Sequence, residues 1–478
     1  MNYRIILNTL GWVLKFEAAA MLLPLLCSVI YGEKTAISFV ICIIICLFSG
    51  ILLSRFSPKN KTMYSKEGFI TVALSWIIMS IFGCLPFVIS GAIPNFVDAL
   101  FETVSGFTTT GASILSEVES LPNGILFWRS FTHWIGGMGV LVFLVAVLPL
   151  SGGNNMYLLK AESPGPSVSK LVPKVKSTAK ILYGIYTVMT LIEIVILLIG
   201  GMKLFDAVTL SFGTAGTGGF GVKNSSMAEY SSFLQNTVTV FMILFSVNFT
   251  LYYAVLAGRV KDALHSEEFR AYMLIVFSSV FVITVNSYHM FDGIGDAVKH
   301  TAFQVASIIS TTGYTTTDFD KWPELSKTIL VLLMFIGACA GSTGGGIKVS
   351  RIIIALKTVA KELVLTAHPK STRKITVDKR IIEHETIRSV NVFFMAYAVI
   401  FVISTLIISI DNFDFITNFT AVAATVNNIG PGLALVGPTQ NFGGYSVLSK
   451  IVLIFDMMAG RLEIFPMLML FSPYTWKK

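Results

Sequence analysis

The chain has 478 residues, of which 54% are hydrophobic and only 13% are charged, and its mean hydropathy is +0.75. Soluble domains use about 25% charged residues, so this composition excludes a soluble globular protein and predicts an all-α polytopic membrane protein. The net charge of +8 does not predict nucleic-acid binding, because no soluble module is present to carry a basic face.

Apolar runs of about 20 residues, each long enough to cross the hydrocarbon core of a bilayer, recur along the chain. They predict ten spans, near residues 10–30, 36–53, 68–91, 125–150, 180–201, 232–257, 270–288, 325–357, 387–410 and 446–472, the eighth being interrupted. Lysines and arginines outside the spans concentrate in alternate connections. The positive-inside rule places that side, with both termini, in the cytoplasm.

Four connections on the opposite side are too long and too apolar for ordinary loops, and we expect each to re-enter the membrane. They cover about 92–124, 202–231, 289–324 and 411–445. Non-helical backbone at membrane depth is tolerated only where protein buries it or where it lines a water-filled path. Four such segments predict one shared aqueous axis.

The four re-entrant segments form a weak internal repeat. Phe101 and Phe303 each precede a glycine by ten residues, and Asp98 and Asp206 each precede one by 13. The aligned glycines are Gly111, Gly219, Gly313 and Gly430. Each segment reads as a short helix followed by an extended, glycine-containing stretch, which is the architecture of a pore loop.

This repeat predicts the organisation of the whole chain. Two N-terminal transmembrane helices precede four tandem helix/pore-loop/helix repeats, which surround one pore. The expected boundaries are 1–66 for the two helices and 67–160, 161–262, 263–365 and 366–478 for the four repeats.

Threonine, asparagine and glycine residues in the four loops indicate a cation filter. Removing water from a cation requires a cage of oxygens, and backbone carbonyls can face one axis where the chain adopts dihedrals that glycine permits. The C-terminal ends of the short helices would add partial negative charge. The alternative is that these small residues only allow helices to pack closely. Close packing could explain the composition of one loop, but it explains four loops at equivalent places less well. The predicted filter residues are Thr109, Thr110, Gly111, Thr217, Gly218, Gly219, Thr311, Thr312, Gly313, Asn428, Ile429 and Gly430.

Five motifs carry a resemblance to a known family: Thr108-Thr109-Thr110-Gly111-Ala112-Ser113, Gly218-Gly219-Phe220, Thr312-Gly313-Tyr314-Thr315-Thr316-Thr317-Asp318, Asn427-Asn428-Ile429-Gly430-Pro431-Gly432 and Gly341-Ser342-Thr343-Gly344-Gly345-Gly346-Ile347-Lys348. Together they resemble the Trk/Ktr/HKT superfamily of potassium transporters, and within it the TrkH-like membrane subunits of bacterial Trk systems. The resemblance covers nearly the whole chain. It implies potassium as the transported ion, bound at the filter residues, with no cofactor. Glycine at the key position of all four loops goes with potassium selectivity in this family.

The resemblance also implies a location and partners. It predicts a protein embedded in the lipid of the bacterial inner membrane that forms a homodimer with one pore per subunit. A ring of nucleotide-binding, TrkA-like regulatory subunits would dock on the cytoplasmic face, at the basic stretches 160–180 and 357–388. The positive-inside signal alone also accounts for the charge of these stretches.

The interruption of the eighth span is rich in glycine. Five of the ten residues in 337–346 are glycine, and each costs a helix about 1 kcal/mol relative to alanine. The resemblance implies that this segment is an intramembrane loop that gates the pore, whereas a static kink is the alternative. The predicted gate residues are Gly341, Ser342, Thr343, Gly344, Gly345, Gly346, Lys348 and Arg461.

Arg461 lies inside the last predicted span. A charge at this depth is costly unless it faces a cavity or a partner. We therefore expect Arg461 to face the pore below the filter, and the family resemblance implies that it lies against the glycine-rich loop and binds its carbonyls. The alternative is a local ion pair with Asp456 or Glu463.

The predicted function is potassium uptake through a four-loop filter gated by the glycine-rich loop. The alternative is a symporter of the same superfamily that couples a cation to sodium ions or protons. A secondary transporter built from inverted repeats is disfavoured, because its broken helices would lie on opposite faces, whereas all four loops here enter from one face. An enzyme is not expected, because the histidines and carboxylates form no acid/base or metal constellation.

Overall fold

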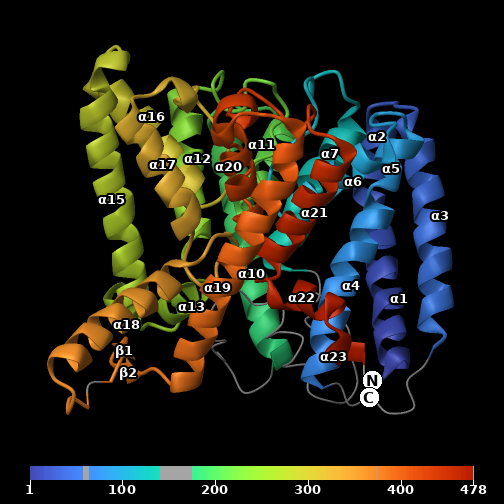
Figure 1. Cartoon of the computed structure of the whole chain (residues 1–478). Coiled ribbons are helices and arrows are strands. Elements are labelled where there is room, and N and C mark those ends of the chain that lie inside the picture. Colours follow the sequence, from blue (N-terminus) through green and yellow to red (C-terminus); the bar gives the residue numbers. More distant parts are fainter. Residues whose placement is uncertain (57–63, 140–174, 373, 477–478) are drawn as a thin grey trace.

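A computed structural model describes residues 1–56, 64–139, 175–372 and 374–476, and its fold is all-α (Figure 1). Within these ranges the only strands are β1 (Thr376–Val377) and β2 (Arg380–Ile381), which pair antiparallel at one end of the molecule. The prediction of an all-α polytopic membrane protein is confirmed by this architecture and by the long apolar helices described below.

The first two spans form a helical hairpin at one side of the bundle (Figure 1). It consists of α1 (Tyr3–Ala20), continued by α2 (Leu22–Ile30), and of α3 (Thr35–Ser54). Gly11 and Gly50 let the two helices approach closely, since a side-chain carbon on Gly11 would lie 2.7 Å from the carbonyl oxygen of Gly50. Small residues at a helix crossing are typical of membrane packing.

The rest of the described chain follows a repeated order of outer helix, short central helix and inner helix. The first repeat contains α4 (Ser65–Gly83), α5 (Leu85–Ile89), α6 (Phe96–Phe107) and α7 (Asn123–Met138). The second contains α10 (Val175–Ile199), α11 (Leu204–Gly216), α12 (Ser232–Phe245), α13 (Phe249–Leu256) and α14 (Val260–His265).

The third repeat contains α15 (Glu267–Ser287), α16 (Ile294–Ile309), α17 (Glu324–Ile336) and α18 (Val349–Ala367). The fourth contains α19 (His384–Ile408), α20 (Phe415–Val426), α21 (Val447–Arg461), α22 (Phe465–Phe471) and α23 (Pro473–Trp476). Single-turn 3-10 helices lie in the connections: η1 (Tyr288–Met290), η2 (Phe319–Lys321), η3 (Ser409–Asp411) and η4 (Ala434–Val436).

The four short central helices α6, α11, α16 and α20 each begin beside a carboxylate. Asp98, Asp206 and Asp296 lie in the first turns of α6, α11 and α16, and the Asp414 side chain caps α20 by accepting from the backbone N–H of Thr417. A carboxylate at this end satisfies free N–H groups and complements the helix dipole. It therefore favours a helix start at each re-entrant segment.

In the part of the chain that the structure describes, six helices are long and apolar enough to cross a membrane: 3–30, 35–54, 65–89, 177–199, 267–290 and 384–411. The span predicted over 232–257 contains a bend that the sequence did not indicate, because α12 and α13 meet at an angle of 91°. The last predicted span, 446–472, is also broken, since Glu463 and Ile464 between α21 and α22 adopt positive φ. The interruption of the eighth span lies between α17 and α18, as predicted.

Both chain termini lie at the same end of the molecule, the end that carries α22, α23 and the β1–β2 pair (Figure 1). Several expectations fall outside the described residues. They are the second half of the 125–150 span, the boundary at 160/161, most of the basic stretch 160–180, and Lys477 and Lys478.

Candidate functional site

The four central helices all lead into segments with the same unusual backbone. We call residues 108–114, 217–221, 310–316 and 427–433 loops 1 to 4. In each loop the aligned glycine and the residue two positions before it have positive φ, while the residue between them does not. The pairs are Thr109 (55°) and Gly111 (78°), Thr217 (56°) and Gly219 (81°), Thr311 (62°) and Gly313 (85°), and Asn428 (56°) and Gly430 (97°).

This alternation of φ turns successive carbonyls toward one side of the chain, whereas those of an ordinary strand alternate between two sides. Threonine is β-branched and rarely adopts left-handed dihedrals, and each such residue costs of order 1–3 kcal/mol. Three of the four loops accept this cost at an equivalent threonine. The surrounding structure must therefore enforce the alternating backbone.

The loops form a closed ring in chain order. A side-chain carbon added to Gly111 would collide with the carbonyl oxygen of Gly218 in loop 2. The same atom on Gly219 would meet the carbonyl oxygen of Thr312, and on Gly313 that of Ile429. On Gly430 it would lie 2.8 Å from the carbonyl oxygen of Thr110, back in loop 1. Each loop thus presents an equivalent carbonyl to its neighbour's glycine, and all twelve predicted filter residues belong to this ring.

Neighbouring loops are also joined by hydrogen bonds. The Asn428 amide donates to the Thr110 hydroxyl oxygen (2.9 Å), which links loop 4 to loop 1. The Tyr314 hydroxyl donates to the Leu210 carbonyl at 3.0 Å and also lies 3.4 Å from the Phe220 carbonyl oxygen, which links loop 3 to the second repeat. These buried contacts hold the strained loops at a fixed distance from one another.

The junction between loops 1 and 2 contains charged residues that sequence reasoning did not place there. Glu102 of α6 is buried and pairs with Arg129 of α7 (2.6 Å). His133, one helical turn further along α7, accepts from the Phe220 N–H through Nε2 (3.2 Å) and bonds the Gly106 carbonyl through Nδ1 (2.7 Å). An arginine within an apolar segment is the signal that could have found this site.

The glycine-rich loop, residues 337–348, contacts loops 3 and 4. The Gly345 N–H donates to the Thr311 hydroxyl oxygen (2.6 Å), and the Gly346 N–H donates to the Asn427 carbonyl (3.1 Å). A side-chain carbon on Gly344 would lie 2.8 Å from the Ser310 carbonyl oxygen. Glycine is therefore required where this loop packs against the ring.

The same loop also fills the break between α12 and α13. The Thr343 hydroxyl donates to the Phe245 carbonyl (3.1 Å), and the Cys339 N–H donates to the Ser246 carbonyl (3.0 Å). These carbonyls would have no helical partner at the end of α12. The glycine-rich loop therefore supplies hydrogen-bond donors to the free carbonyls at this bend, which sequence reasoning missed.

Arg461 binds the glycine-rich loop, as expected. Its guanidinium donates to the Thr343 carbonyl (2.8 Å) and to the carbonyls of Gly137 (2.6 Å) and Gly136 at the end of α7. Lys348 is buried and donates to the Gly344 carbonyl within the loop. All eight predicted gate residues thus lie in the glycine-rich loop or, in the case of Arg461, against it.

The acidic residues near Arg461 have contacts of their own. Asp456 accepts from the Ser404 hydroxyl of α19 (2.7 Å), and Glu463 forms an ion pair with Arg351 of α18. Glu268 of α15 accepts from the N–H groups of Ala340 (2.7 Å), inside the glycine-rich loop, and of Ser350 (3.1 Å), at the start of α18. These carboxylates hold the segments around the loop together.

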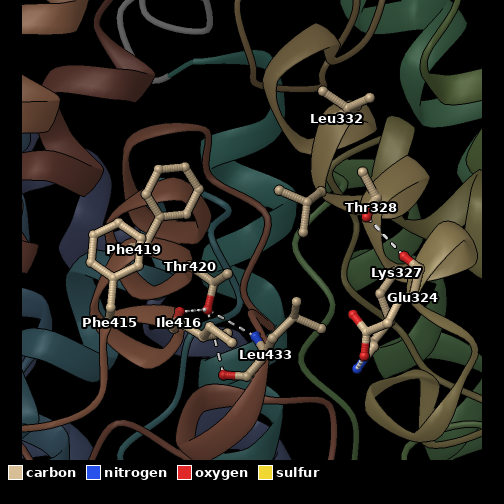
Figure 2. A pocket seen from close by; sticks show the side chains of 10 residues that line it. Glu324, Lys327, Thr328, Leu332, Phe415, Ile416, Phe419, Thr420 and Leu433 are labelled. Atoms are coloured by element: carbon tan, nitrogen blue, oxygen red, sulfur yellow. Dashed lines mark hydrogen bonds and ion pairs between the residues drawn. The ribbon is translucent and has the colours of Figure 1, made fainter.

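A separate groove of about 220 Å³ lies between α17 and α20 (Figure 2). Exposed apolar side chains such as Leu332, Phe415 and Ile416 line it, and the Thr420 hydroxyl beneath them accepts from the Leu433 N–H (3.0 Å). It contains none of the predicted filter or gate residues. Its lining suits contact with lipid chains rather than with an ion.

Comparisons with known proteins agree with this arrangement. The TrkH family model, described as a cation transport protein, matches residues 33–478. The chain is 38% identical to the Trk system potassium uptake protein TrkH of Vibrio parahaemolyticus and 36% identical to that of Escherichia coli, each over the full length of both chains. It is 33% identical to Escherichia coli TrkG, covering all of this chain and 99% of the other.

A solved structure gives the same result. The crystal structure of the potassium transporter TrkH from Vibrio parahaemolyticus superposes with a TM-score of 0.89 at 35% identity, and the match covers 100% of both chains. The expectation of a transport protein rather than an enzyme is thereby confirmed. The family model, the relatives and the shared fold together show that this chain belongs to the TrkH family of cation transport proteins.

Proposed function

We propose that the protein carries potassium ions into the cell across the bacterial inner membrane, through a filter formed by loops 1 to 4. The closed ring of loops carries this proposal. Four equivalent carbonyls meet four glycines around one centre, and the alternating φ aims further carbonyls the same way. Rings of backbone carbonyls replace the hydration shell of potassium in channels. The relatives' names as potassium uptake proteins support the same ion.

The proposed potassium ligands are the backbone carbonyls of the predicted filter residues. The ends of α6, α11, α16 and α20 lead into these loops, so the negative ends of four helix dipoles face them. This field stabilises a cation without a fixed carboxylate in its path. Release of the ion therefore remains possible.

The glycine-rich loop is the proposed gate. It hydrogen-bonds to loops 3 and 4, and Arg461 ties its Thr343 carbonyl to the end of α7. The positive charges of Arg461 and Lys348 raise the barrier for a cation next to the loop. Moving the loop aside would break these bonds and open the path.

The assembly and orientation belong to the same proposal. Both termini face the cytoplasm, the protein forms a homodimer in lipid, and TrkA-like nucleotide-binding subunits dock on the cytoplasmic end. Of the expected docking surface, the structure describes residues 175–180 and most of 357–388, and exposed basic residues lie in both. Charge of this kind steers association with an acidic partner.

Ion flux into liposomes tests the function. Purified protein is reconstituted, and uptake of potassium and of sodium is followed under a membrane potential with no other ion gradient. We expect potassium uptake to exceed sodium uptake and to proceed without a sodium or proton gradient. Equal uptake of both ions contradicts the filter, whereas uptake that needs a sodium or proton gradient supports the coupled symporter.

A further inference from the structure

A buried ion pair links the outer ends of loops 1 and 2. Glu102 lies on α6 with its carboxylate inaccessible to solvent, and the side chain of Arg129 on α7 is 4% exposed. Isolated charges in such a place cost several kcal/mol unless every remaining polar atom is also bonded. The partners of these two side chains therefore show what the pair is used for.

The carboxylate of Glu102 holds loop 1. It accepts from the Ser113 hydroxyl (2.9 and 3.1 Å) and from the Ile114 backbone N–H (3.0 Å), in addition to the Arg129 Nε–H. Ser113 is two residues beyond Gly111. The carboxylate thus fixes the chain where it leaves the proposed filter.

The guanidinium of Arg129 holds loop 2 at the equivalent place. Its Nη1 donates to the Gly221 carbonyl (3.0 Å), and Gly221 is two residues beyond Gly219. The guanidinium carbon lies 3.5 Å from the centre of the Phe220 ring, and the His133 ring lies 4.2 Å from that ring. Phe220 is therefore held between two side chains that are four residues apart on α7.

This arrangement belongs to the first repeat alone among the four. The position of Glu102, nine residues before the aligned glycine, is taken by Leu210, Gln304 and Ala421 in the other repeats. None of these carries a charge. A buried ion pair therefore fixes the junction of loops 1 and 2 through charge-assisted hydrogen bonds, which are stronger than neutral ones.

We propose that Glu102 and Arg129 are positioning residues that set the spacing of loops 1 and 2 and thereby the preference for potassium over sodium. This inference rests on the proposed function of the loops as a filter. Neither side chain needs to touch the ion. Each holds a segment two residues from a filter glycine, so loosening either contact lets the carbonyl ring adapt to a smaller cation.

Three variants test the proposal in liposomes. Arg129→Lys keeps the charge but replaces the planar fork with one ammonium, so it cannot hold both Glu102 and Gly221 in the same way. Glu102→Asp shortens the reach to Ser113 and Ile114. Ser113→Ala removes the hydroxyl that donates to Glu102 and accepts from the Leu115 N–H (3.1 Å), and it leaves the ion pair intact, so it should fold even where the other two do not. Asp98→Asn is the matched control, because Asp98 also lies on α6, one turn before Glu102, and pairs with Lys450 of α21 (2.6 Å).

We expect Arg129→Lys and Glu102→Asp to raise the sodium-to-potassium permeability ratio about fivefold, the effect of one lost hydrogen bond. Ser113→Ala should raise it less, and Asp98→Asn should leave it unchanged. The double variant Arg129→Lys/Ser113→Ala should be non-additive, because both changes act through one carboxylate.

The proposal is overturned if the folded variants keep the wild-type ratio, or if Asp98→Asn shifts the ratio equally. Where Arg129→Lys and Glu102→Asp do not fold, an unchanged ratio in Ser113→Ala overturns it. Gly111→Ser, measured in the same liposomes, separates this failure from that of the filter. A changed ratio in Gly111→Ser with unchanged ratios in the three variants rejects only the positioning role.

Discussion

The Gly345 N–H donates to the hydroxyl oxygen of Thr311 across 2.6 Å, and both residues are buried. Thr311 is the residue of loop 3 that adopts left-handed dihedrals, and Gly345 belongs to the glycine-rich loop. The proposed filter and the proposed gate therefore share a hydrogen bond. Movement of the gate would leave a strained filter residue without one of its partners.

Replacing Thr311 tests this connection. Valine keeps the shape and branching of threonine but cannot accept the Gly345 N–H, and an unpaired buried donor costs about 1–3 kcal/mol. We expect Thr311→Val to favour the displaced loop and to raise potassium flux about fivefold or more. Thr311→Ser keeps the hydroxyl and should stay closer to wild type. Equal flux in the two variants would show that this hydrogen bond does not hold the gate.

A side chain at Gly111 should reduce selectivity. Its φ of 78° disfavours any other residue, and a Cβ there would collide with the Gly218 carbonyl oxygen. Strain of this kind costs of order 1–3 kcal/mol, so we expect Gly111→Ser to lower the preference for potassium over sodium about tenfold. The permeability ratio in liposomes measures it. An unchanged ratio would remove Gly111 from the filter.

Arg461→Ala should raise potassium flux without altering the permeability ratio. The substitution removes the hydrogen bonds to the carbonyls of Thr343, Gly136 and Gly137, and it removes a positive charge beside the path. Flux and expression are compared with those of Asp456→Asn and Glu463→Gln. An unfolded Arg461→Ala protein, together with similar damage in an acidic variant, would instead favour a structural ion pair.

Shortening the glycine-rich loop should open the path. Deleting residues within 341–346 removes contacts to loops 3 and 4, so we expect potassium flux to rise while the protein still folds. Size-exclusion profiles report folding, and the liposome assay reports flux. A folded deletion variant with wild-type flux would mean that the loop does not obstruct the pore.

The four aligned glycines could be predicted because each has a positive φ, which other residues avoid, so glycine recurs at these positions in the sequence. The short helices could be predicted for a similar reason, since apolar re-entrant segments recur between the spans. Which carbonyl each glycine faces could not be predicted. That relationship joins residues between 93 (Gly219 and Thr312) and 320 (Gly430 and Thr110) positions apart in the chain, and no local sequence pattern indicates it.

The broken inner helices could be predicted only where glycine marks them. Residues 246–248, between α12 and α13, contain neither glycine nor proline. The carbonyls left free by the bend accept hydrogen bonds from the glycine-rich loop, which is distant in the sequence. The break after Arg461 runs through Glu463 and Ile464, and isoleucine is β-branched and unfavourable at positive φ. Tertiary contacts therefore override local preference at both places.

The ring of loops has a direction. Each glycine abuts the carbonyl of the following loop, with loop 4 closing onto loop 1, and at all four glycines the three atoms nearest to an added side-chain carbon belong to that following loop. A bulky residue at Gly219 would therefore displace loop 3 first, and one at Gly430 would displace loop 1 first. The four glycines are equivalent by alignment but not interchangeable, because each one lies against a different neighbouring loop. A substitution in one loop should displace the following loop first, with loop 1 following loop 4. A compensating substitution should therefore be sought in that following loop.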